Sequence, residues 1–228
     1  LEISERQDLC SKWMNQWPTV FLSLKSVDGL NFEGAYQQLV YEISLLYQKH
    51  DYLLESTALS EQDKFLFKQL RNRQSEKTDV MRSLQLLTRL LEQHYNKKVI
   101  LLIDEYDVPV AKANNHGYYN EMLDVMKGLM QALKDNTSLR FAVITGCLRI
   151  AKESIFTGTN NFVSDTITDS RLSEYFGFMQ REVDQILKDE DIEDKADSIK
   201  EWYDGYHFGE FDIYCPWDVM NYLLELQR

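Results

Sequence analysis

A continuous apolar run at residues 99 to 103, VILLI, leads directly into two adjacent acids, Asp104 and Glu105. A strand that faces solvent on one side alternates apolar and polar residues, whereas an unbroken apolar run of this length is typical of a strand buried on both faces. Such strands occur in parallel sheets that helices cover. The run therefore predicts an α/β fold in which the two acids stand at the carboxyl end of a buried strand.

Strand-like and helix-like segments alternate through most of the chain. Apolar segments predict strands at residues 18 to 24, 99 to 103 and 139 to 145, and apolar side chains at helical spacing predict helices at about 31 to 50, 79 to 94 and 118 to 134. Ser60, followed three residues later by Asp63, predicts the start of a further helix. This alternation predicts a parallel sheet that is flanked by helices and covered on both faces.

The pattern changes after Ser170, where short helical segments and aromatic turns replace the long alternating segments. We therefore expect two domains: an α/β core at residues 1–170 and a small, mostly helical lobe at residues 171–228. The aromatic side chains of the second segment are expected to pack the lobe rather than to hold a ligand. They are Trp202, Tyr203, Tyr206 and Trp217.

Composition excludes several classes of protein. With 37 acidic and 25 basic residues, the formal net charge is -12, which disfavours direct binding of nucleic acid. The three cysteines and four histidines are scattered, so they predict no zinc site and suggest a reduced, cytoplasmic protein. No apolar run approaches the roughly 18 residues that a membrane span requires.

The acid pair suggests a specific chemistry. In nucleotide hydrolases an Asp at a strand end holds Mg²⁺, and a following Glu can polarise the attacking water. Asp104 and Glu105 fit these two roles, although strand ends in α/β proteins also carry acids simply because they meet solvent.

Thr145 ends the next predicted strand and Arg149 follows it. Thr145 could contact the nucleotide, and Arg149 could neutralise charge developing on the phosphate. The alternative is that Thr145 caps a turn and Arg149 is a surface charge.

A phosphate-binding loop is missing from this sequence. The loop needs GxxxxGK[ST], because its backbone amides wrap the phosphates and its Lys reaches their oxygens. None of the nine glycines is followed by Lys. The chain also lacks an initiator Met, so we expect it to be part of a longer protein. Either the loop precedes Leu1, or the chain does not bind nucleotides.

Several motifs together resemble a known family, the AAA-ATPase-like domain of bacterial proteins that often carry a PD-(D/E)XK nuclease-like segment further on. The blocks that carry the resemblance are VILLIDEYDVPVAKA, HGYYNEM, ITGCLRIAKESIFTGTNNF, LSEYFGF, EWYDGYHFG and IYCPWDV. The resemblance implies a P-loop NTPase-like core that here lacks its Walker A segment. It also implies that Asp104 and Glu105 are the Walker B acids and that residues 145 to 149 are the family's TGxxR block. Asp107 is then expected to be structural, and Asn160 and Asn161 to form a turn or line the site.

We therefore expect the core of an ATPase-like protein that binds ATP and Mg²⁺ when intact, with weak or undetectable binding by this chain alone. Asp104 would hold the metal, Asp104 and Thr145 would contact the nucleotide, and Glu105 and Arg149 would act in hydrolysis. One alternative is an NTPase-shaped interaction module without chemistry. Another is a metal-dependent nuclease that uses Asp104, Glu105 and Asp107. The sequence identifies neither the physiological substrate nor any protein partner.

Overall fold

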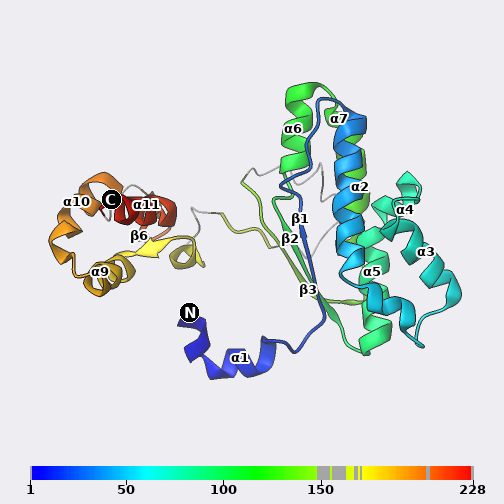
Figure 1. Cartoon of the computed structure of the whole chain (residues 1–228), viewed down its shortest axis with the longest axis horizontal. Helices are drawn as coiled ribbons and strands as arrows, with labels where there is room; N and C mark the ends of the chain where they lie inside the picture. Colours follow the sequence, from blue (N-terminus) through cyan, green and yellow to red (C-terminus); the bar gives the residue numbers. More distant parts are fainter. Residues whose placement is uncertain are drawn as a thin grey trace. The chain divides into compact units, whose positions relative to one another are not determined.

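The computed structural model divides the chain into two compact units, Leu1–Asn160 and Asn161–Arg228, which we describe separately (Figure 1). The structure describes residues 2–147, 155, 163–166, 169, 171–203 and 206–226. The predicted domain boundary between residues 170 and 171 stays a prediction. None of the described helices is both long and apolar enough to cross a membrane.

A three-stranded parallel sheet forms the centre of the first unit. Its strands are β1 (Thr19–Ser23), β2 (Val99–Asp104) and β3 (Leu139–Ile144), in the order β1-β2-β3. The three predicted strands are thus confirmed, and β2 lies between the other two. All three carboxyl ends meet at one edge of the sheet, because the strands are parallel.

Helices flank this sheet, as the alternating sequence pattern predicts. The connection from β1 to β2 contains α2 (Phe32–Gln48), α3 (Glu61–Arg71), α4 (Lys77–Met81) and α5 (Ser83–Tyr95), with a 3₁₀ turn at Asp51–Glu55. The connection from β2 to β3 contains α6 (Val108–His116), α7 (Tyr119–Met130) and a 3₁₀ turn at Gln131–Leu133. A 3₁₀ turn (Glu2–Glu5) and α1 (Gln7–Trp13) precede β1. The expected fold class, an α/β fold with a helix-flanked parallel sheet, is confirmed. The expected cover on both faces is not seen among the described residues, because Phe21 and Val143, on one face, are 51% and 47% exposed.

The single helix expected at residues 79 to 94 is wrong, because two helices occupy this segment. α4 ends at Met81, and Arg82 leaves the helical conformation with φ -101° and ψ 2° before α5 begins. The two helices have different packing partners: α4 lies against α7, whereas α5 lies against β2. The contact with α7 is close, since a Cβ added at Gly128 would lie 2.3 Å from Met81 Cε. The contact with α7 and the contact with β2 are therefore made by two separate helices rather than by one continuous helix.

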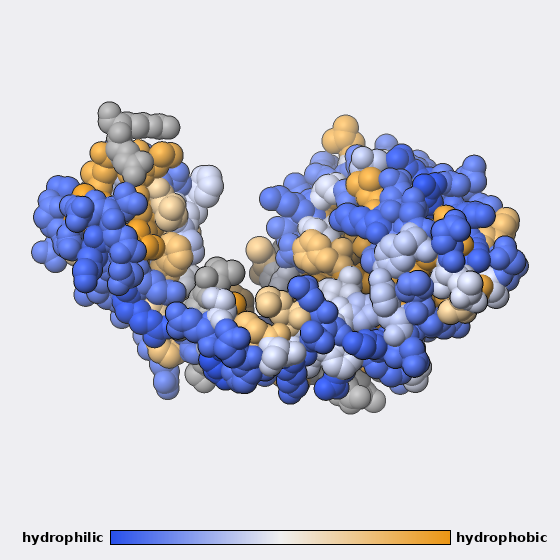
Figure 2. Space-filling model, turned by 60° about the horizontal axis from the view of Figure 1, so that its bottom comes forward, coloured by the Kyte–Doolittle hydropathy of each residue, from blue (hydrophilic) through white to orange (hydrophobic). Residues whose placement is uncertain are grey.

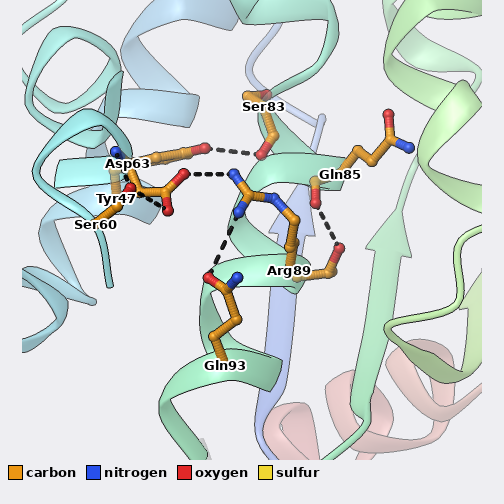
Figure 3. A network of polar contacts seen from close by, with 8 residues as sticks. Tyr47, Ser60, Asp63, Ser83, Gln85, Arg89 and Gln93 are labelled. Carbon is orange, nitrogen blue, oxygen red and sulfur yellow. Dashed lines mark hydrogen bonds and ion pairs between the residues drawn. The ribbon is translucent and has the colours of Figure 1, made fainter. Parts of the chain in front are cut away.

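A polar network joins α3 to α5 and α2 to α5 (Figure 3). Ser60 caps α3 by accepting a hydrogen bond from the Asp63 amide at 3.1 Å, which confirms the predicted helix start. Arg89 of α5 donates to the Asp63 carboxylate at 2.6 Å, and this hydrogen bond lowers the pKa of Asp63. The Tyr47 hydroxyl of α2 donates to the Ser83 carbonyl at 2.8 Å. These bonds hold the helices of the β1–β2 connection together.

The second unit combines helices with a small antiparallel sheet. Its strands are β4 (Phe178–Met179), β5 (Tyr206–Phe208) and β6 (Phe211–Tyr214), in the order β4-β6-β5, and its helices are α9 (Gln180–Asp189), α10 (Ala196–Tyr203) and α11 (Pro216–Leu226). The described part of this unit also contains two 3₁₀ turns, Ser173–Tyr175 and Glu193–Lys195. Helices dominate, as expected, but the sequence did not predict the sheet.

The core of the second unit is mainly aliphatic. It consists of Val183, Leu187, Ile199, Tyr214, Val219 and Leu223. The expectation that Tyr206 and Trp217 pack this lobe is wrong, because their side chains are 51% and 74% exposed. The side chains of Trp202 and Tyr203 lie outside the described residues.

Candidate functional site

The carboxyl edge of the parallel sheet brings together two residues that are 41 positions apart in sequence, Asp104 and Thr145. Asp104 ends β2, and Thr145 follows β3. The Thr145 hydroxyl donates a hydrogen bond of 2.5 Å to Asp104 Oδ1, and the Thr145 amide donates to the Ile103 carbonyl at 2.9 Å. The strand pairing therefore fixes the backbone of Thr145, and its side chain reaches the acid on the neighbouring strand.

Glu105 has an unusual backbone conformation. Its φ is +55°, in the left-handed region that non-glycine residues seldom adopt. Two backbone hydrogen bonds hold the turn: Tyr106 donates to the Thr145 carbonyl at 3.1 Å, and Val108 donates to the Glu105 carbonyl at 3.2 Å. A side chain in this conformation costs on the order of 1 kcal/mol, and such strain is concentrated at functional sites. Six other non-glycine residues of the described chain also have a positive φ, so the strain alone assigns no function to Glu105.

The turn after β2 fits closely against the turn after β3. Asp107 is buried, with 2% of its surface exposed, and its carbonyl accepts hydrogen bonds from Val110 and Ala111 at the start of α6. A Cβ added at Gly146 would lie 2.5 Å from Asp107 Oδ1 and 2.6 Å from the ring of Tyr106. The burial of Asp107 agrees with its expected structural role. The requirement for glycine at 146 was missed, although the Thr-Gly pair at a strand end was a visible signal.

The loop after β1 is also tied to this edge. The Leu24 amide donates to the Asp104 carbonyl at 2.9 Å, so the chain beyond β1 remains paired with β2. Further along the loop, the Tyr118 hydroxyl donates to the Gly29 carbonyl at 2.7 Å. Lys112 of α6 forms an ion pair of 3.3 Å with Asp28. These contacts connect distant segments, and no local sequence pattern predicts them.

The oxygen atoms at this edge suit a magnesium ion. Mg²⁺ prefers carboxylate and other hard oxygen ligands, and proteins usually hold it through one or two carboxylates together with substrate phosphates. Asp104, Glu105 and Thr145 offer carboxylate and hydroxyl oxygens within two adjacent turns. Within the described part of the chain, no group of three or more His, Cys, Asp or Glu residues is placed to hold a metal ion. This donor set fits a metal shared with phosphates, and it does not fit the nuclease alternative with three protein acids.

Three residues singled out in the sequence lie outside the described residues: Arg149, Asn160 and Asn161. Their expected roles stay predictions. A surface hollow of about 430 Å³ is lined by Thr78, Met81, Arg82, Gln85, Gly128 and Gln131. None of these six residues belongs to the carboxyl edge, so the hollow is separate from the candidate site.

Comparison with known proteins gives one family match. The model of the AAA-ATPase-like family, described as a predicted AAA-ATPase, matches residues 3–156. An uncharacterized protein from the vnfD 5′ region of Azotobacter chroococcum mcd 1 is 32% identical over 126 residues. That match covers 54% of this chain and 24% of the relative, so the matched segment is about a quarter of the relative's length. No solved structure matches this chain.

Proposed function

We propose that this chain, which belongs to the AAA-ATPase-like family, supplies the acidic half of an ATP-hydrolysing site in a longer protein. The observation that carries the proposal is the 2.5 Å hydrogen bond from Thr145 to Asp104, beside the strained Glu105, at the carboxyl edge of the sheet. Ligands of open α/β sheets bind outside the carboxyl ends of the strands. The family and this edge therefore point to the same place and the same chemistry.

Each residue has a defined role in this proposal. Asp104 would hold Mg²⁺, which would neutralise charge on the phosphate oxygens when bound. Thr145 orients the Asp104 carboxylate and contacts the nucleotide. Glu105 accepts the proton of the water whose oxygen attacks the γ-phosphorus, while the bond to the β-phosphate oxygen breaks and ADP leaves. Arg149 is proposed to neutralise the charge that develops in this step.

Tight binding of ATP would require a phosphate-binding segment besides these residues. No glycine in the sequence is followed by lysine, so the chain has no GxxxxGK[ST] loop. The backbone amides and lysine of such a loop supply much of the binding energy for a triphosphate. The proposal therefore assigns ATP binding and hydrolysis to the longer protein and assigns weak binding to residues 1–228 alone.

The Glu105→Gln variant of the longer protein tests this proposal. The amide keeps the size of the side chain but cannot accept the proton, so phosphate release should fall at least about 100-fold while Mg²⁺-ATP still binds. Glu121→Gln is the matched control, because Glu121 is an exposed acid in the first turn of α7. Unchanged hydrolysis by Glu105→Gln would overturn the proposal and favour the interaction-module alternative, which needs no catalytic acid.

A further inference from the structure

α11 of the second unit carries apolar side chains on two opposite sides. Val219 and Leu223 belong to the core of the unit and are 0% and 7% exposed. Trp217, Met220 and Leu224 follow one another at positions i, i+3 and i+7, so they share the opposite side of the helix. They are 74%, 52% and 48% exposed. We call this side the outer face of α11, and a helix that is apolar on both sides is typical of a buried helix.

The outer face holds one polar side chain, Asn221, between Trp217 and Leu224. The Asn221 amide donates a hydrogen bond of 2.8 Å to the Trp217 carbonyl, so it is already engaged within the helix. In Figure 2 apolar residues likewise reach the surface of the second unit, on the left, beside strongly hydrophilic ones. An exposed apolar patch with a polar border marks an interaction surface.

The second unit carries almost the whole formal net charge of -12. Residues 161–228 contain 17 acidic and 6 basic side chains, whereas residues 1–160 contain 20 and 19. In α11 itself, Asp218 and Glu225 are seven positions apart and therefore lie along the same flank of the outer face. Among the residues that the structure describes, neither of these two acids has an ion-pair partner. The outer face is thus an apolar stripe beside negative charge that is not neutralised.

This charge distinguishes the possible occupants of the outer face. A second copy of the chain would bring two acidic units together, and an anionic membrane surface would also repel the unit. A helix with apolar residues at i, i+3 and i+7 can cover the stripe, which is about 10 Å long at 1.5 Å per residue. Lys and Arg beside the apolar residues of that helix would pair with Asp218 and Glu225. The complementary occupant is a basic amphipathic helix.

We propose that the outer face of α11 binds a basic amphipathic helix of a partner protein. Trp217 supplies the largest apolar contact, and tryptophan is enriched among the residues that dominate binding energy at interfaces. Asp218 and Glu225 set the orientation of the partner helix, because they select the flank on which it carries Lys and Arg. The interaction uses no residue of the carboxyl edge and no nucleotide, so it is independent of the proposed hydrolysis.

Two designed peptides test this surface on the longer protein and on residues 1–228. Both form amphipathic helices of about 18 residues with Leu at i, i+3, i+4 and i+7, and they carry either Lys or Glu at the flanking positions. Fluorescence anisotropy should show that both proteins bind the Lys peptide at least about 10-fold more tightly than the Glu peptide. Equal affinities would overturn the proposal. So would failure of the longer protein to bind the Lys peptide, because another segment of the same protein would then cover the face.

Matched variants test which residues bind the peptide. Trp217→Ala should weaken binding of the Lys peptide at least about 10-fold, and it should change the melting temperature by less than about 2 °C because the side chain is exposed. Asp218→Asn combined with Glu225→Gln should weaken binding at least about 5-fold at low ionic strength. Phe65→Ala is the control, since Phe65 is 54% exposed on α3, and it should leave binding unchanged. Unaltered binding by Trp217→Ala would contradict the proposal.

Methyl NMR of residues 1–228 distinguishes the peptide from other occupants. The Lys peptide should shift the methyl signals of Met220 and Leu224 and should leave those of Leu30, which is 85% exposed in the first unit, unchanged. Shifts of Met220 and Leu224 that grow with protein concentration without peptide would identify a second copy as the occupant. Shifts caused by phosphatidylserine vesicles would identify a membrane. Either result, or no shift with the Lys peptide, would overturn the proposal.

Discussion

The two faces of the central sheet have similarly apolar sequences and very different surroundings. Leu101 and Ile103, on the face that α2 and α5 cover, are 0% and 2% exposed. Phe141 and Val143, on the other face, are 40% and 47% exposed. The apolar character of a strand therefore indicates that both of its faces are suited to burial. It does not indicate which segment of the protein covers each face.

The largest expected effect comes from a large-to-small substitution on the face that α2 and α5 cover. Leu101→Ala should lower the free energy of unfolding of residues 1–228 by about 2–5 kcal/mol, because it leaves a cavity under α2 and α5. Val143→Ala on the other face should cost less than about 1 kcal/mol in the same chain. Urea denaturation measures both values. Similar costs for the two variants would remove the distinction between the faces.

A smaller effect is expected at the carboxyl edge, where the strands meet the candidate site. Gly146→Ala should destabilise residues 1–228 by about 1–3 kcal/mol, because the added Cβ would lie 2.5 Å from Asp107 Oδ1. Gly34→Ala is a suitable control, since its Cβ would lie 3.5 Å from the nearest atom, Asn31 Oδ1. The control should be neutral or slightly stabilising. A neutral Gly146→Ala would show that the two turns are not packed as described.

The helix layer on the covered face is held partly by the ion pair between Arg89 and Asp63. Arg89→Met should cost about 1–2 kcal/mol at pH 7, a value reduced by the 42% exposure of the Arg89 side chain. The hydrogen bond from Arg89 lowers the folded-state pKa of Asp63, so the stabilisation is present above the unfolded pKa of about 3.9. It is lost as the pH falls through the lower folded-state pKa.

Denaturation curves measured between pH 7 and pH 2 check this prediction. The difference between wild type and Arg89→Met should shrink at the acidic end of that range. Lys77→Met is the control, because its pair with Asp124 is longer, at 3.2 Å, and Asp124 is 65% exposed. It should cost less than about 0.5 kcal/mol at any pH. A pH-independent cost for Arg89→Met would mean that Arg89 acts through packing rather than through the Asp63 charge.

The smallest expected effect has the opposite sign. Glu105→Gly should stabilise residues 1–228 by about 0.5–1 kcal/mol, because glycine adopts a positive φ without strain. The same change should abolish hydrolysis in the longer protein, since the proton acceptor is lost. Denaturation and phosphate release measure the two results. Destabilisation by glycine would indicate that the Glu105 side chain has a structural rather than a catalytic role.

The parts of this molecule that the sequence predicted depend on local patterns. Apolar segments identified all three strands of the parallel sheet, and a capping pair identified the start of α3 at Ser60. The acid pair and the next strand end identified two residues that are hydrogen-bonded in the structure, Asp104 and Thr145. These patterns are short, and each reflects a constraint within one element or between adjacent strands.

The parts that the sequence did not predict depend on packing between distant segments. The break at Arg82 arises because α4 and α5 pack against different elements. Trp217 has a large aromatic side chain of the kind that often lies in a core, but it is 74% exposed. Val219 and Leu223 form the buried side of α11 instead. The fit of Gly146 against Asp107 requires the two turns to be placed side by side. No local rule determines these outcomes.

A calorimetric titration of Mg²⁺-ATP tests most directly the central claim that this chain is the acidic half of a nucleotide site. The longer protein should bind with saturable heat, and Asp104→Asn should weaken that binding when Mg²⁺ is present. Residues 1–228 alone should give no saturable heat up to about 1 mM nucleotide, which corresponds to a binding free energy weaker than about -4 kcal/mol. Tight binding by residues 1–228, or no binding by the longer protein, would contradict the claim.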